Sequence, residues 1–294
     1  MTRKQPHPEI PQPVSIGKEN LAIQPSTEPL AEEAKRLRKA IFEAFYAVGG
    51  GHYGGSFSVL DTVLTLYRRF LRISPDQPDH PLRDRFILSK GHAAMAYYAV
   101  LKSLGLLEAP LESYGSFGSP LEGHPEMASV PHIDYSTGSL GQGISVGLGM
   151  AVALKSTDTK VWVVLGDGEC QEGQVWEAAM LAARYRVDNL ICIVDNNRCQ
   201  EWGWKYRPDL ENTPVPNLEE KWKAFGWKVI QTDGHDFDAL TATFTEASQP
   251  SGQPVLVIAN TLKGKGYATM EANPERFHCT EINEQEKLQL EQQL

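Results

Sequence analysis

Short apolar runs rich in β-branched residues alternate along the chain with longer segments in which apolar residues recur at helical spacing. Continuous apolar runs are typical of strands buried on both faces, whereas a 3.6-residue period indicates an amphipathic helix. We predict strands over residues 85–88, 160–165, 189–194, 228–232 and 255–259. We predict helices over residues 30–48, 58–71 with Ser58 as N-cap, 92–104, 141–154, 173–185, 218–225 and 237–247.

Strands that alternate with helices predict right-handed crossovers and a parallel sheet covered on both faces. The expected fold class is therefore α/β, a doubly wound parallel sheet with helices on both faces. Residues 29–294 are predicted to form this domain. Residues 1–28 are rich in proline and polar groups and have no periodic apolar face, so we expect a flexible arm.

Composition narrows the functional classes. The 294 residues carry a net charge of −9 and show no basic patch, which argues against nucleic acid as a partner. No apolar run approaches the roughly 18 residues that span a bilayer, and the N-terminus has no apolar signal core. The four cysteines, which have no metal-binding or CxxC spacing, are interpreted as reduced thiols: Cys170, Cys192, Cys199 and Cys279. We predict a soluble, cytoplasmic protein that neither binds nor crosses membranes.

Two polar clusters follow neighbouring predicted strands: Gly166-Asp167-Gly168 and Asp195-Asn196-Asn197. Ligands of open parallel sheets bind beyond the carboxyl ends of strands. The Asp167 carboxylate, the Asn197 amide oxygen and a main-chain carbonyl at Cys199 are hard ligands that suit Mg²⁺ or Ca²⁺, and glycines let a diphosphate approach the backbone. The alternative is two ordinary turns, because Gly, Asp and Asn favour turns for steric reasons. The two clusters lie on either side of one predicted helix, and their occurrence together favours the metal site over ordinary turns. The sequence contains no motif for binding a nicotinamide cofactor or ATP.

The GDG cluster, followed about thirty residues later by NN, resembles the thiamine diphosphate motif of transketolases, 2-oxo acid dehydrogenases and decarboxylases. Five further stretches resemble the N-terminal half of transketolase over about residues 35 to 280: GGGHYGGSFSVLDTVLTLY, LRDRFILSKGHAAMAYYAVL, GHPE, STGSLGQGISVGLGMA and NTLKGKGYATMEANPERFH. The resemblance implies thiamine diphosphate and Mg²⁺, with Ca²⁺ or Mn²⁺ as substitutes. It also implies an enzyme that transfers a two-carbon ketol unit from a ketose to an aldose, as sugars or sugar phosphates.

The resemblance also assigns ligands. Mg²⁺ would be held by the side chains of Asp167 and Asn197 and by the Cys199 carbonyl. Residues expected against the cofactor are Gly138, Ser139, Leu140, Gly141, Gly166, Asp167, Gly168, Glu169, Asn197 and Lys263. The family commonly has Pro where Ser139 stands. By position alone, Glu169 and Glu172 are first-turn helix residues, with a subunit interface as the alternative for Glu172, and Lys263-Gly264-Lys265-Gly266 is a flexible basic loop near the diphosphate or a simple turn.

Four histidines match family motifs that surround the reactive carbon and the substrate hydroxyls, and the resemblance makes them catalytic: His52, His92, His124 and His278. Imidazole suits this task because it donates, accepts and titrates near neutrality. The other four are predicted to lie in solvated loops or caps: His7, His80, His132 and His235.

Full-length transketolases continue into a pyrimidine-binding domain that carries the glutamate activating the cofactor. This sequence ends without such motifs, so we expect the N-terminal subunit of a split transketolase, inactive until it pairs with a C-terminal subunit into an α₂β₂ assembly. Three alternatives remain: a 2-oxo acid dehydrogenase E1 α-type subunit, a deoxyxylulose-phosphate-synthase-like subunit, and a non-catalytic relative. The sequence does not predict the ketose donor or the aldose acceptor.

Overall fold

The structure, a computed structural model, describes residues 21, 27–201 and 213–293. Five parallel strands form one sheet in the order β1-β2-β3-β5-β4. The strands are β1 (Arg85–Leu88), β2 (Val161–Gly166), β3 (Leu190–Asn196), β4 (Lys228–Asp233) and β5 (Val255–Asn260). The first three strands lie side by side in chain order. Strand β4 lies at the edge of the sheet, and β5 fills the position between β3 and β4.

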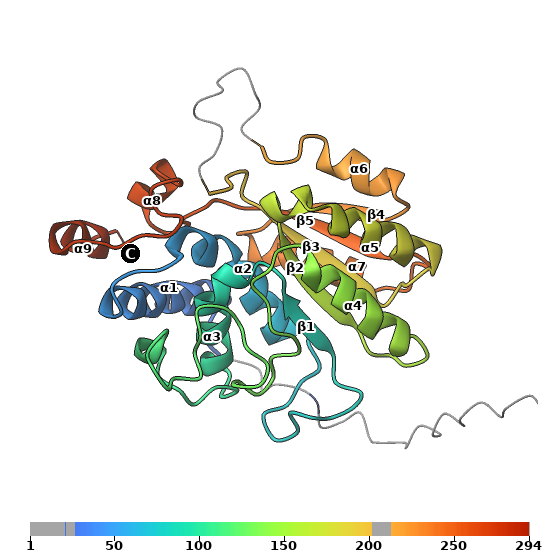
Figure 1. The fold of residues 1–294 in the computed structure, drawn as a ribbon, viewed down its shortest axis with the longest axis horizontal. Helices are drawn as coiled ribbons and strands as arrows, with labels where there is room; N and C mark the ends of the chain where they lie inside the picture. Colours follow the sequence, from blue (N-terminus) through green and yellow to red (C-terminus); the bar gives the residue numbers. More distant parts are fainter. Residues whose placement is uncertain (1–20, 22–26, 202–212, 294) are drawn as a thin grey trace, which may run out of the picture.

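Helices pack on both faces of this sheet (Figure 1). One face is covered mainly by α1 (Leu30–Ala47), α2 (Tyr53–Arg69), α3 (Ala94–Ser103) and α7 (Phe237–Ala247). The other is covered by α4 (Gln142–Ala153), α5 (Gly173–Arg184) and α6 (Leu218–Ala224). Short 3₁₀ turns are η2 (Gly91–Ala93), η3 (Leu111–Ser113) and η4 (Gly168–Gln171), and the last helices are α8 (Ala268–Ala272) and α9 (Glu284–Glu291).

Alternating strand side chains supply the two hydrophobic cores. In β2, Trp162 and Val164 join the core under α2 and α7, whereas Val163 and Leu165 join the core under α4 and α5. The predicted doubly wound α/β fold is thereby confirmed. Because both faces of each central strand are buried, the runs are apolar throughout, which is why the strand positions were predictable from sequence.

The start of α2 differs from the prediction. The helix begins at Tyr53, five residues before Ser58, and includes Gly54 and Gly55 in its first turn. The Ser58 hydroxyl does not cap the helix and instead donates to the Asp195 carboxylate (2.6 Å). A Cβ at Gly54 would lie 2.8 Å from Lys263 Cγ, so the glycines permit close packing of a distant segment, a tertiary requirement that helix propensity does not reveal.

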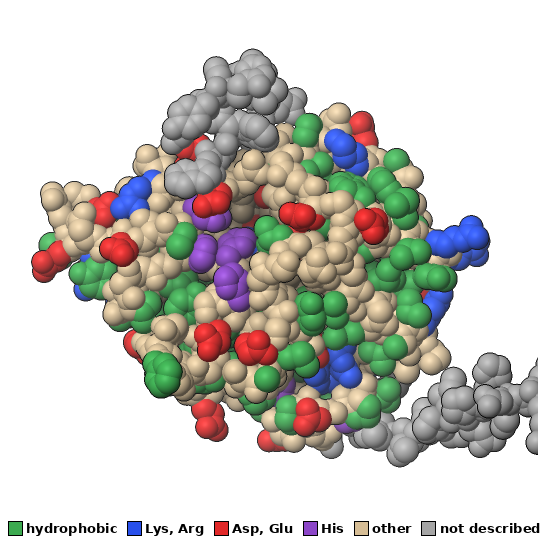
Figure 2. Space-filling view, viewed as in Figure 1, with side chains coloured by type: hydrophobic (Ala, Val, Ile, Leu, Met, Phe, Trp, Pro, Cys, Tyr) green, Lys and Arg blue, Asp and Glu red, His purple; other side chains and the backbone are tan. Residues whose placement is uncertain are grey.

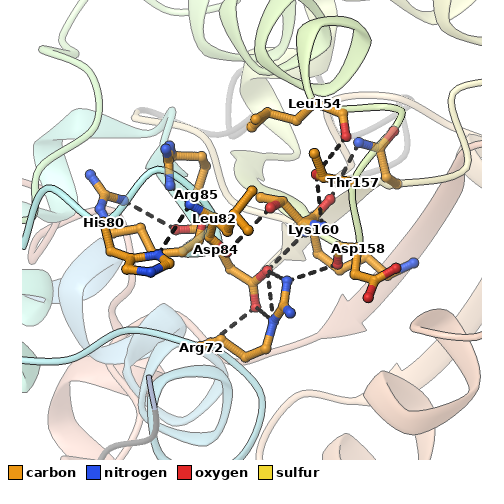
Figure 3. A network of polar contacts seen from close by, with 12 residues as sticks. Arg72, His80, Leu82, Asp84, Arg85, Leu154, Thr157, Asp158 and Lys160 are labelled. Carbon is orange, nitrogen blue, oxygen red and sulfur yellow. Dashed lines mark hydrogen bonds and ion pairs between the residues drawn. The ribbon is translucent and has the colours of Figure 1, made fainter. Parts of the chain in front are cut away.

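A buried polar network fixes the opposite, N-terminal end of the sheet (Figure 3). Asp84, directly before β1, accepts hydrogen bonds from the backbone N–H groups of Arg72 (2.9 Å) and Lys160 (2.8 Å) and from the Arg72 guanidinium (2.9 Å). The network therefore joins the starts of β1 and β2 to the segment after α2, far along the strands from their carboxyl ends.

Two further sequence predictions concern the N-terminal arm and membrane-spanning segments. The expected arm over residues 1–28 falls almost wholly outside the described residues, so it stays a prediction. Within residues 27–201 and 213–293, no helix is both long enough and apolar enough to cross a bilayer.

Candidate functional site

The two polar clusters meet at the carboxyl edge of the sheet. Strands β2 and β3 are neighbours, and Gly166 lies opposite Asp195 in their register. Asp167 and Asn197, each one residue beyond its strand, are therefore side by side as the sequence predicted. This adjacency follows from parallel pairing, because neighbouring strands end at the same edge.

Asp167 is a buried carboxylate that forms no ion pair among the described residues. Its Oδ1 accepts the Gly168 N–H (2.8 Å) and its Oδ2 accepts the Arg198 N–H (2.6 Å). Burial and the nearby Asp195 carboxylate raise the pKa of Asp167 to about 6. Burial and the Asp195 charge both disfavour the ionised form of Asp167. A bound cation would offset both effects, since it compensates the buried negative charge.

Hydrogen bonds at both ends of its amide group fix the orientation of the Asn197 side chain. The Nδ2 group donates to Asp195 Oδ2 (3.3 Å) and to Ser58 Oγ (3.4 Å), while Oδ1 accepts the Cys199 N–H (3.0 Å). The described residues contain no group of three or more His, Cys, Asp or Glu placed to hold a metal. A metal site here thus depends on Asp167 together with amide and carbonyl oxygens, a donor set that fits Mg²⁺.

Sequence reasoning missed the ion pair beneath this site. Lys90, just beyond β1, donates to the buried Asp195 carboxylate, and Ser58 and Thr261 donate to it as well. Burial alone would raise the pKa of Asp195, but the Lys90 ammonium and these hydroxyl groups hold it below its usual value. The signal in the sequence was a lysine at the end of the first strand and an acid directly before the two asparagines.

Glu169 lies in a first helical turn, as its position predicted, and that turn belongs to the short 3₁₀ helix η4. Its side chain is buried, and its carboxylate accepts from Gly141 N (2.8 Å), Gly166 N (3.0 Å) and Ser89 Oγ. Glu169 therefore ties the glycine-rich loop before α4 to the ends of β1 and β2. Its expected contact with the cofactor stays a prediction, whereas Glu172 is exposed and lines the cavity described below.

The four predicted histidines come together from four separate segments. The His52 ring centroid lies 5.5 Å from those of His92 and His278 and 6.4 Å from that of His124. Burial, His124 and the Lys263 ammonium lower the pKa of His52 to about 4, and burial and Lys263 lower that of His278 to about 3. Burial and Lys90 also lower the pKa of His92 well below its usual range. These three imidazoles are neutral at neutral pH.

A cavity of about 590 Å³ separates the histidines from the strand-end cluster. Figure 2 shows the histidines in a hollow of the surface with acidic side chains around it. Predicted site residues in the cavity wall are His92, His124, His278, Gly138, Leu140, Gly166, Asp167, Gly168, Glu169, Asn197, Cys199 and Lys263. Ser139 and Gly141 belong to the same loop as Gly138 and Leu140 without lining the cavity. His52 lines a second cavity, of about 740 Å³, with Arg276.

Lys263 is buried and fixed in this wall. Its Nζ donates to the Cys199 carbonyl (3.1 Å) and to His278 Nδ1 (3.0 Å), and burial lowers its pKa. Of the two predictions for Lys263–Gly266, the structure favours the position beside the cavity, although the segment is held by hydrogen bonds rather than free. Lys263 thereby links a predicted metal-binding carbonyl to a predicted catalytic histidine.

The prediction of solvated positions for the remaining histidines was wrong for three of them. His80 and His132 are buried in loops, and the His235 side chain is only 9% exposed. His80 Nδ1 accepts the Leu82 N–H (3.2 Å), and the His132 carbonyl accepts from Tyr97 (3.1 Å). A loop assignment did not imply solvent exposure because these loops pack against the core. His7 lies outside the described residues.

Comparison with known proteins gives a consistent result. The family model described as "Transketolase, thiamine diphosphate binding domain" matches residues 31–294. The chain is 38% identical to one of the subunits of an apulose-4-phosphate transketolase from Phocaeicola vulgatus, over 88% of this chain and 91% of that protein. It is 40% identical to a 6-deoxy-6-sulfo-D-fructose transketolase subunit from Clostridium sp., over 81% and 86%.

Solved structures agree in fold. A transketolase from Pichia stipitis superposes with a TM-score of 0.79 at 26% identity, over 90% of this chain and 40% of that one. A transketolase from Leishmania mexicana gives a TM-score of 0.79 at 26% identity, over 90% and 41%. The chain thus spans about 40% of the length of these solved enzymes.

Proposed function

The chain belongs to the transketolase family, and we propose that it is the thiamine diphosphate-binding subunit of a two-subunit transketolase. With its partner it transfers a two-carbon ketol unit from a ketose to an aldose, the transferase chemistry of aldehyde or ketone residues. The observation that carries this proposal is the placement of Asp167 and Asn197 at one sheet edge, across a cavity from the histidines.

The residues present fit a magnesium diphosphate. Asp167 and Asn197 would bind Mg²⁺ through side-chain oxygens and Cys199 through its carbonyl, with Ca²⁺ or Mn²⁺ as substitutes. Gly138 and Gly168 would lie against the cofactor, because residues without a side chain let phosphate oxygens approach backbone N–H groups. Thiamine diphosphate, when bound, supplies the carbanion chemistry that carries the two-carbon unit.

The histidines would handle the substrate's hydroxyl groups. Because His52, His92 and His278 are held neutral by burial, each offers one nitrogen that donates and one that accepts. Such a group can orient a sugar hydroxyl without adding a charge, and it becomes an imidazolium when it accepts the hydroxyl proton and neutral again when it returns it. We therefore assign His52, His92, His124 and His278 to substrate orientation and proton transfer.

The names of two similar proteins support a partner subunit and a class of substrate. Both similar bacterial proteins are named as transketolase subunits and for anionic sugars, one a phosphate and the other a sulfonate. We propose that the partner is a C-terminal, pyrimidine-binding subunit in a cytoplasmic α₂β₂ enzyme, since symmetric assemblies commonly build sites between subunits. Phosphorylated and sulfonated ketoses are the donors to screen first.

Calorimetric titration of thiamine diphosphate and Mg²⁺ into the chain with its partner tests the proposal. Asp167→Ala removes the one carboxylate of the proposed ligand set, so affinity should fall by at least about 10-fold. Asp76→Ala serves as a matched control, because Asp76 is exposed in a turn remote from the cavity. Wild-type affinity in Asp167→Ala would contradict the assignment.

A further inference from the structure

Arg38, Asp61 and His235 form a buried hydrogen-bonded chain of side chains between α1, α2 and the end of β4. The Arg38 guanidinium donates to Asp61 Oδ2 (2.6 Å), and His235 Nδ1 lies 2.8 Å from the same oxygen. All three side chains are less than a tenth exposed. Burial alone would raise the pKa of Asp61, but His235 and Arg38 hold it below its usual value, so the bridging carboxylate is ionised.

Arg38 and His235, on either side of Asp61, both form hydrogen bonds with the backbone of the segment 262–265. His235 Nε2 accepts the Leu262 N–H (2.8 Å), and Arg38 Nε donates to the Lys265 carbonyl (3.0 Å). Because Nε2 is an acceptor, the neutral ring carries its proton on Nδ1 and donates it to Asp61. The tautomer of His235 is thus set by contacts on both sides, and the segment 262–265 is held at both ends.

Lys263 and Gly264 lie between these two anchor points. Gly264, with φ +84°, turns the backbone immediately after Lys263, and Gly264 N donates to the Gly54 carbonyl (3.1 Å). The Lys263 side chain packs against Gly54 and reaches Cys199 O and His278 Nδ1 in the cavity wall. A small shift of this backbone would move the ammonium away from both contacts.

We propose that Arg38, Asp61 and His235 form a clamp that positions Lys263 in the wall of the cavity where the diphosphate would bind. The three are positioning residues, since they act through Lys263 and do not line the cavity. This inference rests on the proposed function for the role of Lys263, while the holding of segment 262–265 rests on the contacts alone. Histidine suits the position between Asp61 and the Leu262 backbone because it accepts one backbone N–H and donates to a carboxylate through opposite ring nitrogens.

Two substitutions at His235 separate the clamp from general packing. The amide of His235→Gln ends near the place of Nε2 and retains an acceptor for Leu262 N–H. The amide of His235→Asn ends near Nδ1, retains a donor to Asp61 and loses that acceptor. Asp84→Asn is the matched control, because Asp84 is also a buried carboxylate bonded to arginine and to backbone N–H groups, at the other end of the sheet (Figure 3).

Hydrogen exchange and cofactor binding are measured on the full chain with its partner. We expect the 262–265 amides to exchange faster in His235→Asn, and thiamine diphosphate with Mg²⁺ to bind about 10-fold more weakly, as for other groups that orient ligands. His235→Gln should restore both values to near wild type. Asp84→Asn should lower the melting temperature and leave exchange of 262–265 and affinity unchanged.

A double variant tests whether His235 acts through Lys263. In a Lys263→Met background, His235→Asn should weaken binding no further, because residues that act as one unit are not additive. Unchanged exchange in His235→Asn, or an equal loss of affinity in Asp84→Asn, would overturn the clamp. Failure of the wild-type complex to bind thiamine diphosphate would instead refute the proposed function, and the exchange comparison would still decide whether His235 holds the segment.

Discussion

At the scale of single residues, the carboxyl edge of the sheet holds its titratable groups in fixed and different states. Asp195 is ionised against Lys90, while burial and the ammonium groups of Lys90 and Lys263 keep His52 and His278 neutral. Neutral imidazoles beside two lysines fit a cavity that receives an anionic cofactor, because they add no charge of their own.

Acidification should therefore destabilise the folded chain. The pKa of His52 is about 4 in the fold and about 6.5 in an unfolded chain, so the unfolded state binds protons first. The free energy of unfolding should fall as pH drops from about 6.5 toward about 4. Urea unfolding at pH 7 and pH 5 measures this change. The free energy of unfolding should fall less between these pH values in His52→Gln than in wild type, and an identical fall would contradict a neutral His52 in the folded chain.

Removal of a cavity histidine should affect turnover far more than folding. His92→Ala and His124→Ala should each lower turnover about 10²-fold, the usual scale for positioned proton-transfer groups. Circular dichroism should remain that of the wild type, and His7→Ala, remote in sequence from every cavity residue, serves as control. Wild-type turnover in either cavity variant would assign that histidine a structural role only.

The sequence predicted some contacts of the site and could not predict others. Asp167 and Asn197 were placed together correctly because each ends a strand and parallel neighbours end at one edge. The Lys90–Asp195 pair joins residues 105 positions apart, and no local pattern encodes that contact. The hydrogen bonds of Glu169 were unpredictable for the same reason, since two of its donors lie in the loop before α4 and at the end of β1.

At the scale of elements, glycines decide how closely α4 approaches the sheet. A Cβ at Gly143 would overlap the Ser89 side chain, whose hydroxyl donates to Glu169. Gly149 lies on the outer side of the same helix, with nothing within 4 Å of its hypothetical Cβ. The two glycines therefore differ in environment: Gly143 permits close packing on the sheet, whereas Gly149 faces open space.

The pair Gly143→Ala and Gly149→Ala tests this interpretation. Overpacking at Gly143 should destabilise the chain by about 1–3 kcal/mol. Gly149→Ala should stabilise it by about 0.5–1 kcal/mol, because alanine loses less backbone entropy in a helix. Chemical unfolding of both variants is the measurement, and a stabilised Gly143→Ala would show that α4 is not held by this contact.

Element boundaries were predictable where periodicity was local and failed where tertiary contacts set them. Helix α7 was predicted over its observed range, Phe237–Ala247. Helix α2 starts early because its glycine-rich first turn packs on Lys263 and Phe277. The short helices α8 and α9 were missed, since five and eight residues are too few to show a helical period.

At the scale of the whole molecule, one apolar surface is unusual. Val152 on α4 and Met180 and Leu181 on α5 are each about half exposed, and Tyr185 follows them at the end of α5. The helices α4 and α5 pack against each other on the same face of the sheet (Figure 1). Large exposed apolar groups favour a permanent interface.

A charge placed on this surface should block assembly without unfolding the chain. Met180→Glu combined with Leu181→Glu should prevent the higher assembly, because an interface cannot bury two unpaired carboxylates cheaply. Leu288→Glu on α9 is the control, since Leu288 is also exposed but belongs to another element. Light scattering with the partner present measures the outcome, and full assembly of the double variant would exclude α4–α5 as the interface.

The central claim is that this chain supplies the diphosphate half of a ketol-transferring site that a partner completes. Ketose cleavage should be measured with saturating thiamine diphosphate and Mg²⁺ for the chain alone and for the chain with its pyrimidine-domain partner, over phosphorylated and sulfonated ketoses. We predict turnover by the mixture and none above background by the chain alone. Equal turnover by the isolated chain would contradict the two-subunit account, and cleavage of no ketose by the mixture would contradict the transketolase activity itself.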